Sequence, residues 1–420
     1  MSNKINKPKD CDDLALGLLL VEQAREKILD SVSAVKEIEE VAIRDALSRV
    51  LAKDVLSTIN VPSHTNSAMD GYALAGSDLP SKGTATFSVV GTVLAGAPLS
   101  ITVNLGECVR IMTGGKIPDG TDTVIMQENV TRTDEKISIT ADHKAGQNVR
   151  FAGEDLATGD MVFKAGKQLT PADIGMLASI GQAKVNVVRR LKVAFFSTGD
   201  ELCSVGKPLG DGQIYDSNRY TLYTMLKRLN VEIIDMGVIP DQRDLIEQAF
   251  QEGSSQADVL VTSGGVSVGE ADFVKETLEK LGQVGFWRMA MKPGKPLAFG
   301  KINDCDFFGL PGNPVSAMVT FYQFVQPALQ MIMGMPHVEP LLLKLKCISN
   351  IKRKPGRMEY QRGIITTDDN GESVVESTGN QGSGILSSMG NANCFIVLPL
   401  ESSGVKSGEI VTVQPFAGLV

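Results

Sequence analysis

The stretch 259–275, VLVTSGGVSVGEADFVK, carries hydroxyl, glycine and acidic residues at a spacing that could bind a phosphate together with a metal ion. A short β-branched segment leads into Ser263–Gly265 and then into Glu270 and Asp272, after which a helical pattern begins. Backbone N–H groups at a strand–loop–helix junction bind anions, and the acidic pair could hold a divalent cation against them. An ordinary connection with acidic helix-capping residues explains the loop equally well. Other segments must therefore decide its role.

Further polar residues follow other apolar segments of the same region. Ser197–Glu201, STGDE, ends one apolar run, Asp241 follows another, and Lys292–Pro296, KPGKP, sets two lysines on a proline-constrained turn. Because the ends of parallel strands share one edge of a sheet, these side chains are expected to meet the glycine loop there. Turns that serve only structure would have no reason to be so uniformly acidic, hydroxylic or basic. The pattern favours one site with an acidic part and a basic part.

Strand and helix patterns alternate from residue 191 to residue 333. Apolar runs predict the strands, and apolar residues at helical spacing predict the helices between them. The expected strands are 191–196, 231–237, 259–261 and 286–291, the expected helices 217–229, 245–251 and 313–333, and the expected hairpin pairs 297–301 with 306–310. Pro327 marks the place for a kink in the last helix. This alternation predicts a central, doubly wound α/β domain with a mostly parallel sheet.

β patterns flank the central domain on both sides. Short segments separated by glycine turns predict a β domain inserted before it, over 84–140, and a C-terminal β-barrel-like domain or sandwich over 341–420. Apolar residues at helical spacing before residue 40 predict N-terminal helices that pack on another domain. The expected division is 1–56 for these helices and a linker, 57–145 for the β domain, 146–188 for a connecting segment that returns to the linker, 189–337 for the α/β domain and 338–420 for the C-terminal β domain.

The composition excludes several classes of protein. The chain is 43% hydrophobic, which is enough to build cores in several domains. Its net charge is −8 and no basic run is interleaved with aromatic residues, which argues against nucleic acid as a partner. The six cysteines are scattered without a CxxC or a histidine pairing, so neither a disulfide framework nor a zinc site is expected. The apolar run 14–21 is too short for a membrane span and lacks signal-peptide flanks, so we expect no membrane association and a cytoplasmic location.

Five polar stretches outside the central domain leave two interpretations open. In 66–74, NSAMDGYAL, a β-turn capped by Asp70 is favoured over a site, and in 146–155, GQNVRFAGED, a salt-bridged linker is favoured. In 110–119, RIMTGGKIPD, a phosphate contact and a hairpin end are equally well supported. The stretches 356–363, GRMEYQRG, and 379–388, GNQGSGILSS, are rich in polar side chains that could belong to a site, but either one taken alone could be an exposed barrel rim.

Taken in order, these stretches together with FSTGDEL, TSGGVSVGEADF, MKPGKP and FGLPGNPVSA resemble the MoeA-type molybdopterin molybdenumtransferases, the family that includes the E-domain of gephyrin. The resemblance runs from about residue 13 to the C-terminus. It implies a four-part subunit that forms a homodimer. It also implies an activity, because the family takes adenylylated molybdopterin from a partner protein, inserts molybdate at the dithiolene and releases AMP with the help of a divalent cation, usually Mg²⁺.

The resemblance assigns roles to residues at matching positions of this chain. The carboxylates expected to hold Mg²⁺ and to orient water are Glu201, Asp241 and Asp272, with Glu270 as a weaker candidate. The substrate is expected to contact Ser263, Gly264, Gly265, Ser267, Asp216, Pro311, Gly312 and Asn313. A tetrahedral dianion needs several converging donors, and those expected for molybdate are Lys292, Lys295, Pro296, Arg288, Arg362 and Ser383. The further catalytic candidates are Asp155 and, expected to act from the other subunit, Asp70 and Thr113.

Two positions depart from the family pattern. Arg288 stands where many relatives carry lysine, and because guanidinium and ammonium are not equivalent at an oxyanion, its role stays open. His64-Thr65 replaces a commoner aromatic-acidic pair. A non-catalytic molybdopterin-binding or assembly scaffold of the same fold is the alternative function, although a scaffold has no physical need for carboxylates opposite paired lysines. The expected partners are a second copy of the chain, the adenylyltransferase that supplies the substrate, and acceptor molybdoenzymes or their chaperones.

Overall fold

The computed structural model describes residues 18–264 and 273–416 of the 420-residue chain. The contacts divide the chain into two compact units. The first comprises the described residues up to Glu39, the segment Ser48–Val50 and the described residues from Val188 onward, and the second comprises Glu40–Leu47 and Leu51–Val187. No helix in these described ranges is long and apolar enough to cross a membrane.

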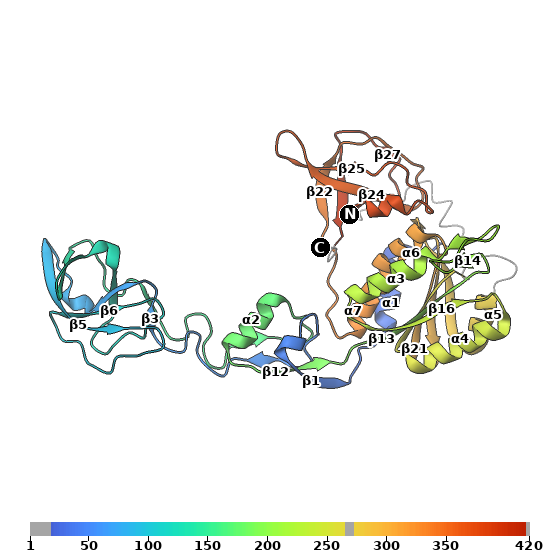
Figure 1. The fold of residues 1–420 in the computed structure, drawn as a ribbon. Coiled ribbons are helices and arrows are strands. Elements are labelled where there is room, and N and C mark those ends of the chain that lie inside the picture. Colours follow the sequence, from blue (N-terminus) through green and yellow to red (C-terminus); the bar gives the residue numbers. More distant parts are fainter. Residues whose placement is uncertain (1–17, 265–272, 417–420) are drawn as a thin grey trace, which may run out of the picture. The chain divides into compact units, whose positions relative to one another are not determined.

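The first unit is built around a six-stranded sheet (Figure 1). In spatial order its strands are β16 (Glu232–Ile239), β13 (Lys192–Thr198), β17 (Val259–Ser263), β21 (Cys305–Leu310), β20 (Pro296–Ile302) and β18 (Gln283–Arg288). The first four strands pair in parallel, whereas β20 and β18 form an antiparallel edge. The predicted mostly parallel sheet is confirmed, and so is the hairpin that joins β20 to β21.

Helices cover both faces of this sheet (Figure 1). Successive side chains of a strand point to opposite faces, so Phe195 of β13 packs with Leu222 on one face and Phe196 packs with Phe250 on the other. The first face carries α1 (Val21–Ser31), α3 (Ser217–Arg228), α6 (Pro314–Thr320) and α7 (Gln326–Ile332), and the second carries α4 (Arg243–Gln256) and α5 (Phe273–Leu281). Burial on both faces explains why these strands are continuous apolar runs, and it confirms the doubly wound domain.

The predicted long helix over 313–333 is present, but its winding changes in the middle. It consists of α6, a π-helical segment over Phe321–Val325, and α7. Pro327 lies in the first turn of α7. Proline lacks an N–H group and its ring crowds the carbonyl four residues earlier, so the wider π-helical turn accommodates Pro327 without ending the helix.

The C-terminal part of the first unit is a closed five-stranded barrel. The strands follow the order β24 (Met358–Thr367), β25 (Ser373–Ser377), β22 (Leu343–Cys347), β28 (Ile410–Pro415) and β26 (Cys394–Leu398), and β26 pairs back with β24. The predicted β-barrel-like domain is confirmed. The short strand β19 (Met291–Lys292) also pairs with β24, in parallel. This pairing fixes the start of the KPGKP turn against the barrel.

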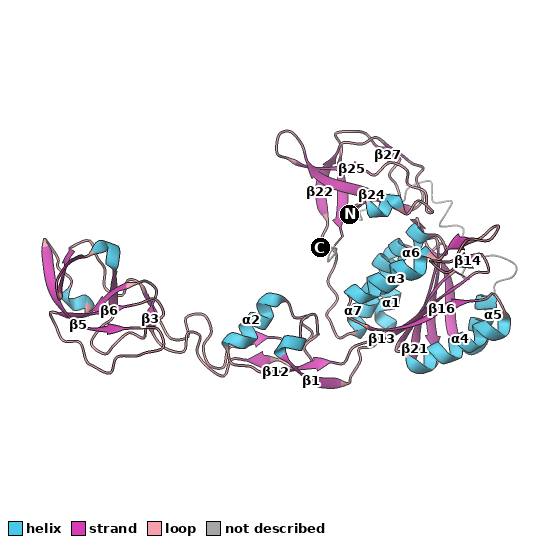
Figure 2. Cartoon of the chain, in the orientation of Figure 1, coloured by secondary structure: helices cyan, strands magenta, loops and turns pink. Residues whose placement is uncertain are grey.

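The second unit is mainly β (Figure 2). Its largest sheet has the order β7 (Thr123–Met126), β4 (Gly71–Leu74), β6 (Glu107–Ile111), β5 (Thr84–Val93), β9 (Lys136–Thr140) and β8 (Thr131–Thr133). Separate apolar clusters around Phe87 and around Val109 form its cores. A third cluster, around Leu177, packs α2 (Pro171–Ser179) in the rest of the unit. The β domain predicted before the α/β domain is confirmed.

Candidate active site

A cavity of about 980 Å³ lies at the carboxyl edge of the α/β sheet. Loops that follow β13, β16, β17 and β21 line it together with the turn 292–296, and the barrel adds residues 380–383 and Arg357. The residues predicted from the sequence that line it are Glu201, Asp241, Gly264, Lys292, Lys295, Pro296, Pro311, Gly312, Asn313 and Ser383. The fold thus brings these residues together at the edge where parallel strands end.

Glu201 and Asp241 form the acidic side of the cavity. Burial raises the pKa of Asp241, and the negative charges of Asp200 and Glu201 raise this pKa further. The Asp241 N–H group donates to Asp200 Oδ1 at 3.1 Å, which keeps the two residues close. Carboxylates gathered in this way repel one another, and a divalent cation relieves the repulsion. Mg²⁺ usually binds one or two carboxylates together with phosphate oxygens and water, so the donor set fits this cation.

The protein does not build a closed metal cage in the part of the chain that the structure describes. No group of three or more His, Cys, Asp or Glu side chains there could hold a metal ion. The two carboxylates therefore fit a cation that is shared with a phosphate-bearing ligand. The predicted ligand Asp272 and the weaker candidate Glu270 lie outside the described residues, as do Gly265 and Ser267.

Gly264 begins the glycine loop with a backbone that requires glycine. Its φ is 93°, and an added Cβ would lie 2.7 Å from the carbonyl oxygen of Thr198. Its N–H group donates to the Leu310 carbonyl at 3.2 Å. The expectation that this N–H group binds a substrate phosphate is therefore revised, because the group already donates to a carbonyl of β21. Gly264 instead allows the loop to pass close to β13 and keeps this wall of the cavity free of a side chain.

Ser263 and Asp216, both expected to contact the substrate, are buried and do not line the cavity. Asn218 of α3 donates to Ser263 Oγ at 2.7 Å and to the Gly312 carbonyl at 2.6 Å, which ties the loops after β17 and β21 together. Asp216 caps α3 by accepting the Arg219 N–H group at 3.0 Å. Its other oxygen, Oδ2, is buried without a hydrogen-bond partner in the described structure.

The turn 292–296 forms the basic side of the cavity. Lys292 Nζ lies 3.1 Å from Glu359 Oε1, and the lysine side chain is 52% exposed whereas the glutamate side chain is 6% exposed. Lys295 is also exposed. Gly294 has a φ of 100°, and an added Cβ would lie 2.6 Å from Thr320 Oγ1. Only glycine fits there, so the fold holds the two lysines on a turn of defined shape.

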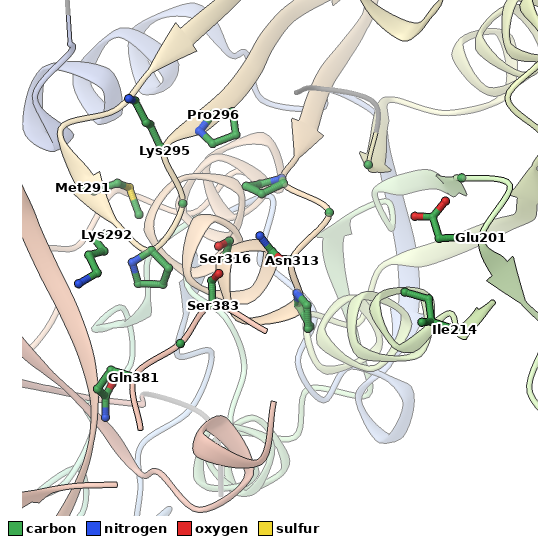
Figure 3. Close-up of a pocket in the computed structure, with 18 of the residues that line it drawn as sticks. Glu201, Ile214, Met291, Lys292, Lys295, Pro296, Asn313, Ser316, Gln381 and Ser383 are labelled. Carbon is green, nitrogen blue, oxygen red and sulfur yellow. The ribbon is translucent and has the colours of Figure 1, made fainter. Parts of the chain in front are cut away.

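The acidic and basic sides do not neutralise each other. No ion pair joins the two lysines to the two carboxylates of this cavity in the described structure. Figure 3 shows Glu201 and Lys292 on opposite sides of the cavity, with Asn313 and Ser316 between them. The separation leaves one side for a cation and the other for an anion.

Arg362 holds the barrel loop of the cavity rather than lining the cavity itself. This side chain is 1% exposed, and burial lowers the pKa of Arg362 to about 10. Its Nε donates to Ser388 Oγ at 2.9 Å and its Nη2 donates to the Gly382 carbonyl at 3.2 Å. The carbonyl of Ser383 accepts the Val315 N–H group at 3.1 Å. The predicted direct contact with molybdate is revised to a positioning role, because the side chain is buried, does not line the cavity and donates to the barrel loop.

Sequence reasoning assigned no site role to several residues that line the cavity, among them Ile214, Arg357, Asn380 and Gln381. The last three lie in the stretches 356–363 and 379–388, whose polar composition was the available signal. Arg288 was expected in the site, but it is exposed at the end of β18 and does not line the cavity.

The remaining candidates belong to the second unit. Asp70 Oδ1 accepts both the N–H group and the hydroxyl of Thr113 at 2.7 Å, and these bonds, the backbone bond first, lower the pKa of Asp70. Thr113 lies 43 positions away, in the stretch 110–119, so this contact joins two of the predicted catalytic candidates and is not the local cap that the turn interpretation predicts. Asp155 is exposed. Near it, Arg150 Nε lies 4.0 Å from Glu154 Oε1, which is the ion pair that the linker interpretation predicts.

Comparisons with known proteins match the chain along most of its length. Family models match residues 19–181 as the MoeA N-terminal region (domain I and II), 194–331 as a probable molybdopterin binding domain and 344–416 as the MoeA C-terminal region (domain IV). A molybdopterin molybdenumtransferase from Haemophilus influenzae is 48% identical over 405 residues, which cover 96% of this chain and 100% of the relative. The chain belongs to the molybdopterin molybdenumtransferase family.

Two further relatives agree with this assignment to the molybdopterin molybdenumtransferases. The enzyme of that name from a Nostoc species is 34% identical, over 92% of this chain and 90% of the relative. The crystal structure of a molybdopterin biosynthesis MoeA protein from Pyrococcus horikoshii matches with a TM-score of 0.82 at 28% identity, and the match covers 95% of this chain and 100% of that protein. The cavity lies in the segments matched by the probable molybdopterin binding domain and the MoeA C-terminal region.

Proposed function

We propose that this chain is a transferase of molybdenum cofactor biosynthesis that inserts molybdate into adenylylated molybdopterin and releases AMP. One observation carries the proposal: a single cavity has two carboxylates on one side and two lysines on the other, in a chain that is 48% identical to a molybdopterin molybdenumtransferase. Cleaving a phosphoric anhydride while delivering an oxyanion requires both kinds of group, kept from neutralising each other. A non-catalytic scaffold has no need for that separation.

The acidic side would bind the metal and the phosphates. Glu201 and Asp241 would hold Mg²⁺, with Asp272 as a third proposed ligand and substrate phosphate oxygens as the remaining donors. When bound, Mg²⁺ supplies neutralisation of the negative charge on the anhydride phosphates. Gly264 and Gly312 leave this wall without side chains, so the main chain can approach the substrate closely.

The basic side would bind molybdate, which is a tetrahedral dianion and a substrate. Lys292 and Lys295 would contact its oxygens and the Ser383 hydroxyl would donate a hydrogen bond. Arg362 would keep the Ser383 loop in place. Pro296 restricts the turn, so less conformational entropy is lost when both lysines close on the anion.

We propose further that the chain acts in the cytoplasm as a homodimer and receives its substrate from the adenylyltransferase that makes it. Asp70 and Thr113 support the dimer, because they belong to the second unit and match family positions expected to act from the other subunit. Asp155, a further catalytic candidate, also belongs to the second unit. The finished cofactor would pass to acceptor molybdoenzymes or their chaperones.

Release of AMP tests the proposed reaction directly. The purified protein is incubated with adenylylated molybdopterin, molybdate and Mg²⁺, and AMP is measured by chromatography. We expect release that requires both molybdate and Mg²⁺ and stops when EDTA is added. A complete mixture that releases no AMP, although molybdopterin binds, would replace the enzyme by the scaffold.

A further inference from the structure

A second cavity, of about 540 Å³, adjoins the first and is lined mainly by cations. Its lining consists of Lys352, Arg353, Lys354, Pro355, Arg357, Lys292 and Glu359. Lys292 and Arg357 line both cavities, so the two cavities meet at these side chains. Five cationic side chains face one carboxylate in a chain whose net charge is −8. The positive potential here is therefore a local feature and not a consequence of the overall charge.

The basic loop, residues 352–357, joins β23 (Ile351–Lys352) to β24 and is braced by Arg353. Arg353 Nη1 donates to the carbonyls of Leu398 at 3.1 Å and Pro399 at 2.8 Å, and its Nη2 donates to the carbonyl of Arg357. These bonds tie the loop to the end of β26 and to its own last residue. Arg353 thus shapes the loop, and the other cations of the basic loop are left to face the cavity.

Three of these cations have no charged partner among the residues that the structure describes. The side chains of Lys352, Lys354 and Arg357 make no hydrogen bond or ion pair to any described residue of the chain, and both lysines are exposed. Like charges held close together on a braced loop repel one another, and an anion that binds among them removes this repulsion. A tetrahedral oxyanion can accept hydrogen bonds from several such donors at once.

We infer that Lys352, Lys354 and Arg357 form a second oxyanion subsite, which shares Lys292 with the basic side of the candidate active site. Its ligand is a tetrahedral oxyanion with two negative charges, either molybdate or a phosphate group of the organic substrate. The role of this subsite rests on the proposed function, since an anion held there lies beside the place where molybdate is consumed. The binding itself does not depend on turnover.

Calorimetric titration of the full chain with sodium molybdate, and separately with sodium phosphate, tests the binding. The double variant Lys352→Ala/Lys354→Ala should bind these oxyanions about tenfold or more weakly, because each charged hydrogen bond contributes about that much. The matched control Lys344→Ala/Lys346→Ala removes the same charge from exposed positions of β22 outside the cavity and should change the affinity less than about twofold. Unchanged affinity in the first variant, or equal losses in both, would overturn the inference.

Circular dichroism confirms that the variants are folded, and Lys352→Gln/Lys354→Gln replaces the alanine pair if that pair does not fold. Steady-state AMP release then separates the two sources of the oxyanion. A raised KM for molybdate alone identifies molybdate as the ligand, and a raised KM for adenylylated molybdopterin alone identifies a substrate phosphate. If the unaltered protein releases no AMP but the calorimetric difference is present, the subsite stands and the proposed function fails.

Discussion

Replacing Gly294 by alanine should distort the turn that carries Lys292 and Lys295. Gly294 has a φ of 100°, and the left-handed region costs an ordinary residue about 1–2 kcal/mol. The new Cβ would also lie 2.6 Å from Thr320 Oγ1, and overpacking of this kind costs about 1–3 kcal/mol. The combined loss of about 2–5 kcal/mol is a large part of the roughly 5–15 kcal/mol that stabilises a typical folded protein.

Thr320→Ala provides a matched control for the steric part of this loss. Thr320 Oγ1 is buried and has no hydrogen-bond partner among the described residues, so its removal leaves no other polar group unpaired. In the double variant the contact with Thr320 Oγ1 is gone, but the 3.0 Å approach to Met291 Cε and the backbone strain at Gly294 remain. Adding Thr320→Ala to Gly294→Ala should therefore restore about 1–3 kcal/mol of the free energy of unfolding.

Scanning calorimetry and steady-state AMP release measure the two consequences. The unfolding midpoint of Gly294→Ala should fall by roughly 4–20 °C, and the double variant should recover part of the fall. The KM for molybdate should rise while the Mg²⁺ dependence stays the same, because the acidic side of the cavity does not touch this turn. An unchanged midpoint in Gly294→Ala, or no recovery in the double variant, would refute the steric reasoning.

Two other substitutions probe contacts away from this turn. Arg362→Lys keeps the charge but cannot donate to both Ser388 and Gly382. In steady-state kinetics the KM for molybdate should therefore rise about tenfold, and the KM for adenylylated molybdopterin should not change. Equal rises in both KM values would contradict the positioning role. Burial raises the pKa of Asp258, but the Arg189 guanidinium at 2.8 Å and the Lys192 N–H group outweigh burial and hold this pKa below its usual range. The Asp258 carboxyl binds a proton less readily in the folded chain than in the unfolded chain. Its ionised form therefore stabilises the fold above about pH 4, and this stabilisation is lost as the pH falls through the pKa of the folded state. Between about pH 7 and pH 3 the unfolding midpoint of Asp258→Asn should therefore fall less than that of the unaltered chain. Equal falls in the two midpoints would contradict this.

The sequence allowed the gathering of the site residues to be predicted because their positions relative to strands are local information. Glu201 and Asp241 follow apolar runs that predict strands, and the ends of parallel strands meet at one edge. Asn313 was expected in the site only from the family resemblance. The hairpin and the barrel were predictable for the same reason, since alternating segments and glycine turns specify neighbouring strands.

Burial of polar side chains inside the barrel could not be predicted in this way. Along β24 the residues Glu359, Gln361 and Arg362 are buried, yet their sequence is that of a solvated strand. They are tolerated because they find partners in distant segments, such as Lys292 for Glu359 and Ser388 for Arg362. Such partners depend on how the chain closes on itself, which no local pattern contains.

The donor at Gly264 was misjudged for a related reason. Its N–H group is bonded to Leu310, a pairing set by the sheet order and not by the glycine loop. The five-part division of the chain and the roles of Asp70, Thr113 and Asp155 stay predictions. Asp70 and Thr113 are expected to act from a second copy of the chain.

Strand β19 belongs to the α/β domain by sequence and to the barrel by hydrogen bonding. Met291 and Lys292 pair with Met358 and Glu359, and the Met358 N–H group donates to the Ala290 carbonyl at 2.8 Å. The barrel is therefore held to the α/β domain by its covalent connection, by this shared ladder and by the bond from the Val315 N–H group to the Ser383 carbonyl. Swinging the barrel away as a lid would break these main-chain bonds, so we expect any gating motion at the cavity to come from the loops around it.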